Sequence, residues 1–180
     1  MSKKEGVEKR VLYIGLDDSN HGVYPELCLA YFSTLPKDFN LQDFPFRRNM
    51  SLLDRMQSPY RDYRFLILSP GDSSSRLNNL AIAAPSLILP YLEENEPFEE
   101  LRIGVDGCLT SLSKDYVHNE LSDFVGLISI QGYIKYKQGN GKNKVYRQPR
   151  ILAFADVQVH HLYSTLTLDA LKAHEKRVSF

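Results

Sequence analysis

The sequence predicts an α/β fold, in which short buried strands alternate with helices. Residues 11–16 are a short apolar run, which is the pattern of a central strand buried on both faces, and residues 101–105 predict another short strand. Residues 77–92 are instead apolar at helical spacing, interrupted by Pro85 and Pro90, and predict a core-facing helix that is kinked or split at the prolines. The 180 residues suit one domain, 1–180, whose charged start at 1–10 is expected to be flexible.

The remaining elements are assigned in the same way. Residues 27–35 and 64–68 are predicted strands, each stopped by a proline or a polar turn. Short polar-capped segments with helical spacing predict the helices, which are 50–56, 113–124 with Ser113 as its cap, and 157–178.

Composition and charge exclude several classes of protein. Lys plus Arg and Asp plus Glu are 22 each, so the chain is not a globally basic nucleic-acid binder, although a local basic face is still allowed. Cys28 and Cys108 have no metal-ligand spacing, and two free thiols indicate a reducing compartment. No signal peptide or apolar run of membrane-spanning length is present. We therefore predict a soluble, cytoplasmic protein without a membrane partner, and the oligomeric state is left open.

Three predicted strands are followed at once by aspartate. Asp17 and Asp18 end the first, Asp106 follows 101–105, and Asp156 follows the run LAFA. In an open α/β sheet, groups at the carboxyl ends of neighbouring strands project into one crevice. Carboxylates gathered there repel one another unless a hard cation such as Mg²⁺ or Mn²⁺ binds them. We therefore predict that the four aspartates form a catalytic metal site.

The roles within that site follow from two-metal chemistry. Two cations roughly 3.5–4 Å apart activate water and stabilise a leaving oxygen in phosphodiester cleavage. Asp17, Asp106 and Asp156 are the expected metal ligands, and Asp18 is a fourth ligand or positions water. The alternative is structural, because aspartate after a strand is a common turn residue and helix cap. Its recurrence on three strands favours function.

The aspartate motifs also resemble a known family. The segment 15–22, Gly-Leu-Asp-Asp-Ser-Asn-His-Gly, resembles the opening motif of type 2 ribonuclease H, and Asp106-Gly107 and Ala155-Asp156 resemble its later acidic positions in the same order. The resemblance implies a ribonuclease-H-like mixed central sheet flanked by helices and a metal-dependent nuclease. Departures are Asp18 where the family has glutamate, His21 before the glycine where it has arginine, and no small-residue helix signature after Asp156.

A basic hairpin is predicted before the last aspartate. Residues 125–136 and 145–154 are β-rich, and the glycines and asparagines of 137–144 predict the turn between them. Cations interleaved with tyrosine are suited to phosphate contacts and base stacking. An edge strand protected by lysines is the structural alternative. The predicted nucleic-acid-binding residues are Lys135, Lys137, Lys142, Lys144, Arg147, Arg150 and Tyr136.

A second cationic stretch and three histidines are weaker signals. The stretch is diluted by acidic residues, and it contains Arg47, Arg48, Arg55, Arg61 and Arg64. His21, His160 and His161 lie close in sequence to the aspartates, where one of them would serve as a ligand or proton shuttle.

Three functions follow from these observations. The first is a divalent-metal-dependent nuclease that acts on RNA-containing or structured nucleic acid. The second is a non-catalytic ribonuclease-H-like binding or assembly module. The third is an actin-like phosphotransfer or ATP-binding domain, which is disfavoured because the turn DDSNHG is poorer in Gly, Ser and Thr than phosphate-binding turns are.

Overall fold

The computed structural model describes residues 9–19, 25–45, 52–69, 76–95, 97–134, 137–138 and 145–165. The segment 1–8, where flexibility was predicted, lies outside these ranges. Within the part of the chain that is described, no helix has the length and apolar composition needed to cross a membrane.

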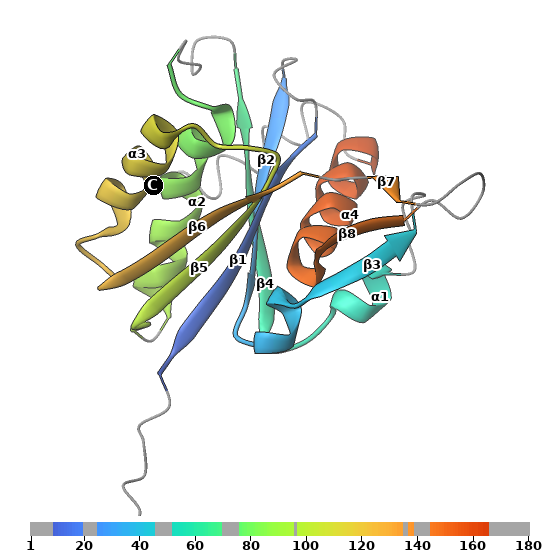
Figure 1. Cartoon of the computed structure of the whole chain (residues 1–180), viewed down its shortest axis with the longest axis horizontal. Helices are drawn as coiled ribbons and strands as arrows, with labels where there is room; N and C mark the ends of the chain where they lie inside the picture. The colour runs from blue at the N-terminus through green and yellow to red at the C-terminus, as the bar shows by residue number, and fades with distance from the viewer. Residues whose placement is uncertain are drawn as a thin grey trace, which may run out of the picture.

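A mixed five-stranded sheet forms the centre of the described structure, which confirms the predicted α/β class (Figure 1). Its strands are β1 (Val11–Asp18), β2 (Glu26–Ser33), β4 (Arg61–Leu68), β5 (Glu100–Asp106) and β6 (Leu127–Tyr133). They lie in the order β4-β2-β1-β5-β6. β1 pairs antiparallel with β2, as β2 does with β4, whereas β1–β5 and β5–β6 are parallel pairs.

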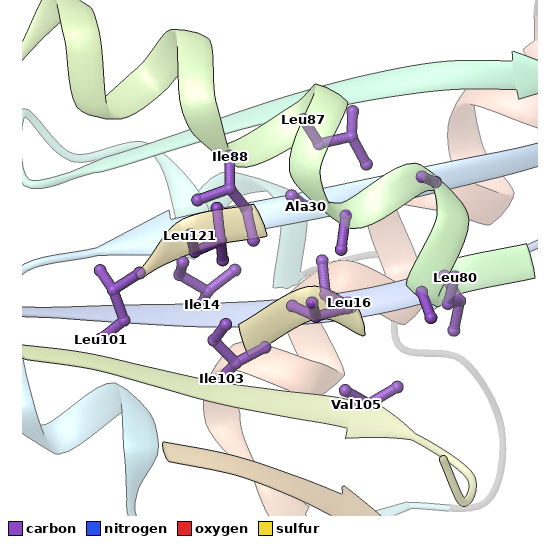
Figure 2. Packing of buried hydrophobic residues seen from close by; sticks show 14 of the residues in the cluster. Ile14, Leu16, Ala30, Leu80, Leu87, Ile88, Leu101, Ile103, Val105 and Leu121 are labelled. Carbon is purple, nitrogen blue, oxygen red and sulfur yellow. The ribbon is translucent and has the colours of Figure 1, made fainter. Parts of the chain in front are cut away.

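Helices cover both faces of this sheet. α2 (Asn79–Glu94) and α3 (Ser111–Leu121) pack on one face, and α4 (Arg150–Thr165) packs on the other (Figure 1). Figure 2 shows the first of these layers, in which Ile14 and Leu16 of β1 lie under Leu87 and its neighbours on α2. Burial on both faces explains why residues 11–16 of β1 form a continuous apolar run, whereas β5 carries the exposed Arg102 between its buried residues.

A second, three-stranded sheet lies beside α4. It has the order β3-β8-β7, from β3 (Leu41–Pro45), β8 (Val145–Pro149) and β7 (Lys137–Gln138). Two short helical segments accompany it, η1 (Pro36–Phe39) and α1 (Leu52–Met56).

The predicted strand over 145–154 is wrong in its second half. β8 ends at Pro149, and Arg150 begins α4, which also contains the segment that was predicted to start at 157. Proline lacks the N–H that a continuing strand needs, and it is well tolerated at a helix start. The first turns of α4 are buried all round, since every residue from 151 to 155 is buried. A short run that is apolar throughout shows no helical periodicity, so it could not be told from a buried strand.

The predicted pairing of 125–136 with 145–154 is also wrong. β6 joins the central sheet beside β5, whereas β8 pairs antiparallel with β3 and with β7. β6 buries its isoleucines against the α2–α3 core, since Ile128 and Ile130 pack there. Pairing with β5 lets β6 bury these apolar side chains, whereas a solvent-exposed hairpin with β8 would leave them in water.

Two helix predictions need smaller corrections. The helix predicted to be kinked or split is one continuous helix, α2, with Pro85 and Pro90 inside it, so the split alternative is wrong. The lost hydrogen bonds are compensated by its apolar face, which is buried in the core. α3 begins earlier than predicted, because Thr110 rather than Ser113 is the cap: the Thr110 side chain accepts a hydrogen bond from the Ser113 N–H at 3.2 Å.

Gly15 lets α4 approach β1 closely. A Cβ at this position would lie 2.8 Å from the Ile151 carbonyl oxygen. We expect Gly15→Ala to lower the free energy of unfolding by about 1–3 kcal/mol, because the helix backbone must move away from the strand. Urea unfolding measures the change. Gly126→Ala is the matched control, since a Cβ there meets nothing within 4 Å; equal effects of the two changes would contradict the close approach.

Candidate functional site

Asp17 and Asp106 lie side by side at one end of the central sheet. Gly15 pairs with Gly104 across the parallel β1–β5 ladder, and each aspartate comes two residues later on its strand. Because side chains alternate along a strand, both carboxylates project from the face of these two glycines. α4 covers that face: a Cβ on Gly15 would meet Ile151, and one on Gly104 would meet Leu152.

Asp156 reaches this region from α4 and not from a strand end. It lies within the helix, one turn after Leu152, whose side chain lies over Gly104. α4 rises toward the same end of the sheet as the arrowheads of β1 and β5 (Figure 1). A residue one turn beyond Leu152 on the same side of the helix is therefore carried toward Asp106, which follows Gly104 on β5.

The strand geometry separates Asp18 from the other acids. Asp18 pairs with Cys28, which belongs to the core cluster beneath α2 and α3, whereas Asp17 pairs with Leu29, which belongs to the cluster beneath α4. Directly opposed residues of an antiparallel pair share a face. Asp17 and Asp18 consequently point to opposite sides of the sheet.

Asp17 is almost completely buried. It is 1% exposed, and the backbone N–H of Asp18 donates a hydrogen bond to its Oδ1 at 2.8 Å. Removing a carboxylate from water is costly unless its surroundings compensate. This hydrogen bond provides part of the compensation, and it also fixes the orientation of the carboxylate.

Asp18 instead belongs to a buried polar group on the α2 side. The amide of Asn79 donates a hydrogen bond to the buried Glu26, which lies on β2 close to Cys28. Burial raises the pKa of the Cys28 thiol, and the negative charges of Glu26, Asp18 and Asp17 raise it further. Cys28 therefore stays a protonated thiol, which is neither a nucleophile nor a metal ligand.

Of the three histidines predicted to lie near the aspartates, His160 is the one that the structure places beside one of them. His160 follows Asp156 by one turn of α4, and its Nε2 lies 3.7 Å from Asp156 Oδ1. His161 instead lines a separate cavity of about 390 Å³ with Tyr31, Tyr63 and others. His21 lies outside the described residues.

Carboxylates are ligands of the kind that Mg²⁺ and Mn²⁺ prefer, because both ions bind oxygen. In the ranges that the structure describes, no three His, Cys, Asp or Glu side chains already lie close enough together to hold a metal ion. The backbone thus brings Asp17 and Asp106 to neighbouring positions, but the described side chains do not form a complete set of metal ligands.

The predicted nucleic-acid-binding residues are only partly described. Lys137 is placed by its backbone in β7, Arg147 is exposed on β8, and Arg150 begins α4. The Arg150 guanidinium donates to Gln42 Oε1 from Nε at 3.2 Å and from Nη2 at 3.1 Å. The others, outside the described residues, are Lys135, Tyr136, Lys142 and Lys144.

A buried ion pair was not foreseen from the sequence. Asp38 of η1 is completely buried, and Arg61 of β4 contacts both of its carboxylate oxygens, at 2.7 and 2.9 Å. The Ser33 hydroxyl donates to Asp38 Oδ2 at 2.7 Å. The only signal in the sequence was Arg61 in the second cationic stretch, because nothing local marks Asp38 as its partner.

The sequence matches no known protein-family model, and no curated protein matches it. The assignment of function therefore rests on the geometry of the site: two carboxylates on adjacent parallel strands, with an acid-bearing helix packed over them. This arrangement places two carboxylates at one end of the sheet, in the region that α4 covers.

Proposed function

We propose that the protein is a divalent-metal-dependent nuclease with a ribonuclease-H-like core. The observation that carries the proposal is the juxtaposition of Asp17 and Asp106 on the same face and at the same end of the β1–β5 pair. The position of Asp156, on the helix that covers that face, adds a third carboxylate.

The sheet arrangement supports the ribonuclease-H-like assignment. Three antiparallel strands are extended by two parallel ones, and helices lie on both faces. The acidic motifs also occur in the order expected from the resemblance to type 2 ribonuclease H. The final acid, however, lies inside a helix, and the second residue of the Asp17–Asp18 pair faces away.

Asp17, Asp106 and Asp156 would hold the metal. A bound Mg²⁺ or Mn²⁺ would supply activated water and stabilise the departing oxygen of a phosphodiester. The chain itself fixes the carboxylates: the Asp18 N–H orients Asp17, and the β1–β5 ladder sets the spacing of the two strands. His160, whose Nε2 lies 3.7 Å from Asp156 Oδ1, would be the candidate proton shuttle of this site.

A second candidate is a non-catalytic binding or assembly module with the same core. The orientation of Asp18, away from Asp17, favours it, because a fourth ligand or water-positioning group is then missing from the α4 face. In this case the remaining acids would serve folding and not chemistry.

Cleavage assays separate the two functions. We expect Mg²⁺- or Mn²⁺-dependent cleavage of at least one of four substrates: an RNA–DNA hybrid, single-stranded RNA, single-stranded DNA and branched DNA. Excess EDTA should abolish the activity, and added metal should restore it. Binding of these nucleic acids without any cleavage in either metal would instead support the module.

A further inference from the structure

A cavity of about 250 Å³ lies between β3, α1, β4 and α4. The cavity lies farther along the sheet than Asp17. Arg61, which lines the cavity, pairs with Ser33 at the end of β2. Asp17 pairs with Leu29, four residues earlier on the same strand. Among the described residues, no acidic side chain lines the cavity. Its lining residues are Gln42, Phe44, Leu52, Arg55, Arg61, Arg150 and Phe154.

Arg61 forms the rigid wall of this cavity. Besides its two contacts with Asp38, its Nη1 donates to the Arg55 carbonyl oxygen at 2.8 Å, and its guanidinium lies 4.9 Å from the centre of the Phe154 ring. All three guanidinium nitrogens of Arg61 are thus engaged. Asp38 neutralises the positive charge of Arg61. The pair therefore forms part of the cavity wall without adding net charge to it.

Two further guanidinium groups give the cavity its charge. Gln42 holds Arg150 through two N–H groups, and Asp38 Oδ1 lies 3.8 Å from the Arg150 Nη1. Arg55 is exposed on α1, and among the described residues no carboxylate forms an ion pair with it. After the Arg61–Asp38 pair is counted as neutral, Arg55 and Arg150 leave a local charge of about +2, with each arginine permanently charged.

We propose that this cavity binds a phosphate monoester dianion. The two positive charges of Arg55 and Arg150 match the two negative charges of the dianion. The planar N–H groups of a guanidinium also fit a pair of phosphate oxygens better than they fit a monovalent anion. Arg150 is held in position by Gln42, so little conformational entropy is lost when the ligand binds. The rings of Phe44 and Phe154 and the side chain of Leu52 provide an apolar surface beside the phosphate. This site is separate from the aspartates and does not depend on the proposed nuclease activity.

The monoester has two possible sources, a free small phosphate compound and the terminal phosphate of a nucleic-acid strand. Calorimetric titration at constant ionic strength compares four probes: inorganic phosphate, adenosine monophosphate, a 5′-phosphorylated oligothymidine and the same oligothymidine with a 5′-hydroxyl. Tighter binding of the mononucleotide assigns the site to small compounds, and tighter binding of the phosphorylated strand assigns it to strand ends. Equal binding of the two oligothymidines, without saturable binding of the small phosphates, overturns the proposal.

Arg55→Gln is the decisive variant, because Arg55 is exposed and its loss should leave folding intact. We expect it to weaken the binding of phosphate monoesters at least about tenfold. Arg102→Gln is the matched control, since Arg102 is also exposed and is paired with Glu100 outside the cavity. Thermal melting verifies that both variants fold. Unchanged monoester affinity in Arg55→Gln, or an equal loss in Arg102→Gln, would show that the cavity is not the binding site.

Discussion

Asp17→Asn and Asp106→Asn should each lower the rate of metal-dependent cleavage roughly 1,000-fold. Both changes remove one negative charge and nearly preserve the shape of the side chain. Because the two carboxylates lie next to each other on one face of the β1–β5 pair, each loss should weaken the same cation site. Single-turnover cleavage at saturating metal measures the effect on chemistry separately from the effect on metal affinity.

Asp18→Asn is the sharpest control for this prediction. Asp18 is adjacent in sequence to Asp17 and is nearly as buried, at 9% against 1% exposed, but it points toward α2. We expect Asp18→Asn to retain cleavage within about tenfold of the wild-type rate once folding is verified. A loss as large as that of Asp17→Asn would mean that the metal site spans both faces, which the strand alternation contradicts.

Asp38→Ala should cause the largest loss of stability, about 3–5 kcal/mol in the free energy of unfolding. Asp38 is completely buried, and its removal leaves the Arg61 guanidinium, 8% exposed, without its counter-charge. The Ser33 hydroxyl loses its acceptor as well. Urea denaturation followed by circular dichroism measures the loss.

The control for Asp38→Ala is an ion pair in which only the carboxylate is buried and the arginine is exposed. Glu100 contacts Arg102 at 2.6 Å, but the Arg102 side chain is 45% exposed. Glu100→Gln should therefore cost less than about 1 kcal/mol. If the Asp38 and Glu100 variants lost equal stability, burial would not be what makes the Asp38–Arg61 pair important.

The central strands could be predicted from sequence because their signal is local. The run at 11–16 is apolar at every position, and the run at 101–105 is interrupted only by the exposed Arg102, since helices cover both faces of most of the sheet. Aspartate directly after each run was also readable, and the parallel pairing of β1 and β5 brings Asp17 and Asp106 to one sheet end.

The positions of Asp18 and Asp156 were harder to predict from the sequence. The period-two alternation of a strand already requires adjacent residues to face opposite sides, so Asp17 and Asp18 were distinguishable in principle. The run before Asp156 was harder to interpret, because β8 continues into α4 at Pro149 and Arg150 without an intervening loop. Proline was the one local signal that a helix starts there.

The arginine cavity could not be predicted from the sequence. Its charged residues come from α1, β4 and α4, and Arg150 meets Gln42 across 108 positions of the chain. The cationic stretch contained Arg55 and Arg61, but Arg64 of the same stretch pairs with Glu94 on the other face. Only tertiary structure distinguishes an arginine that lines a cavity from one in a surface ion pair.

Calorimetric titration of Mn²⁺ into the wild-type protein and into Asp106→Asn tests the metal site most directly. In this proposal, the affinity for the cation comes from the carboxylates of Asp17 and Asp106, which repel each other and are held side by side by β1 and β5. We expect saturable binding to the wild type and at least about tenfold weaker binding to the variant, because one of the ligands becomes neutral. Absence of saturable heat from the folded wild type, or identical isotherms for the two proteins, would contradict the account.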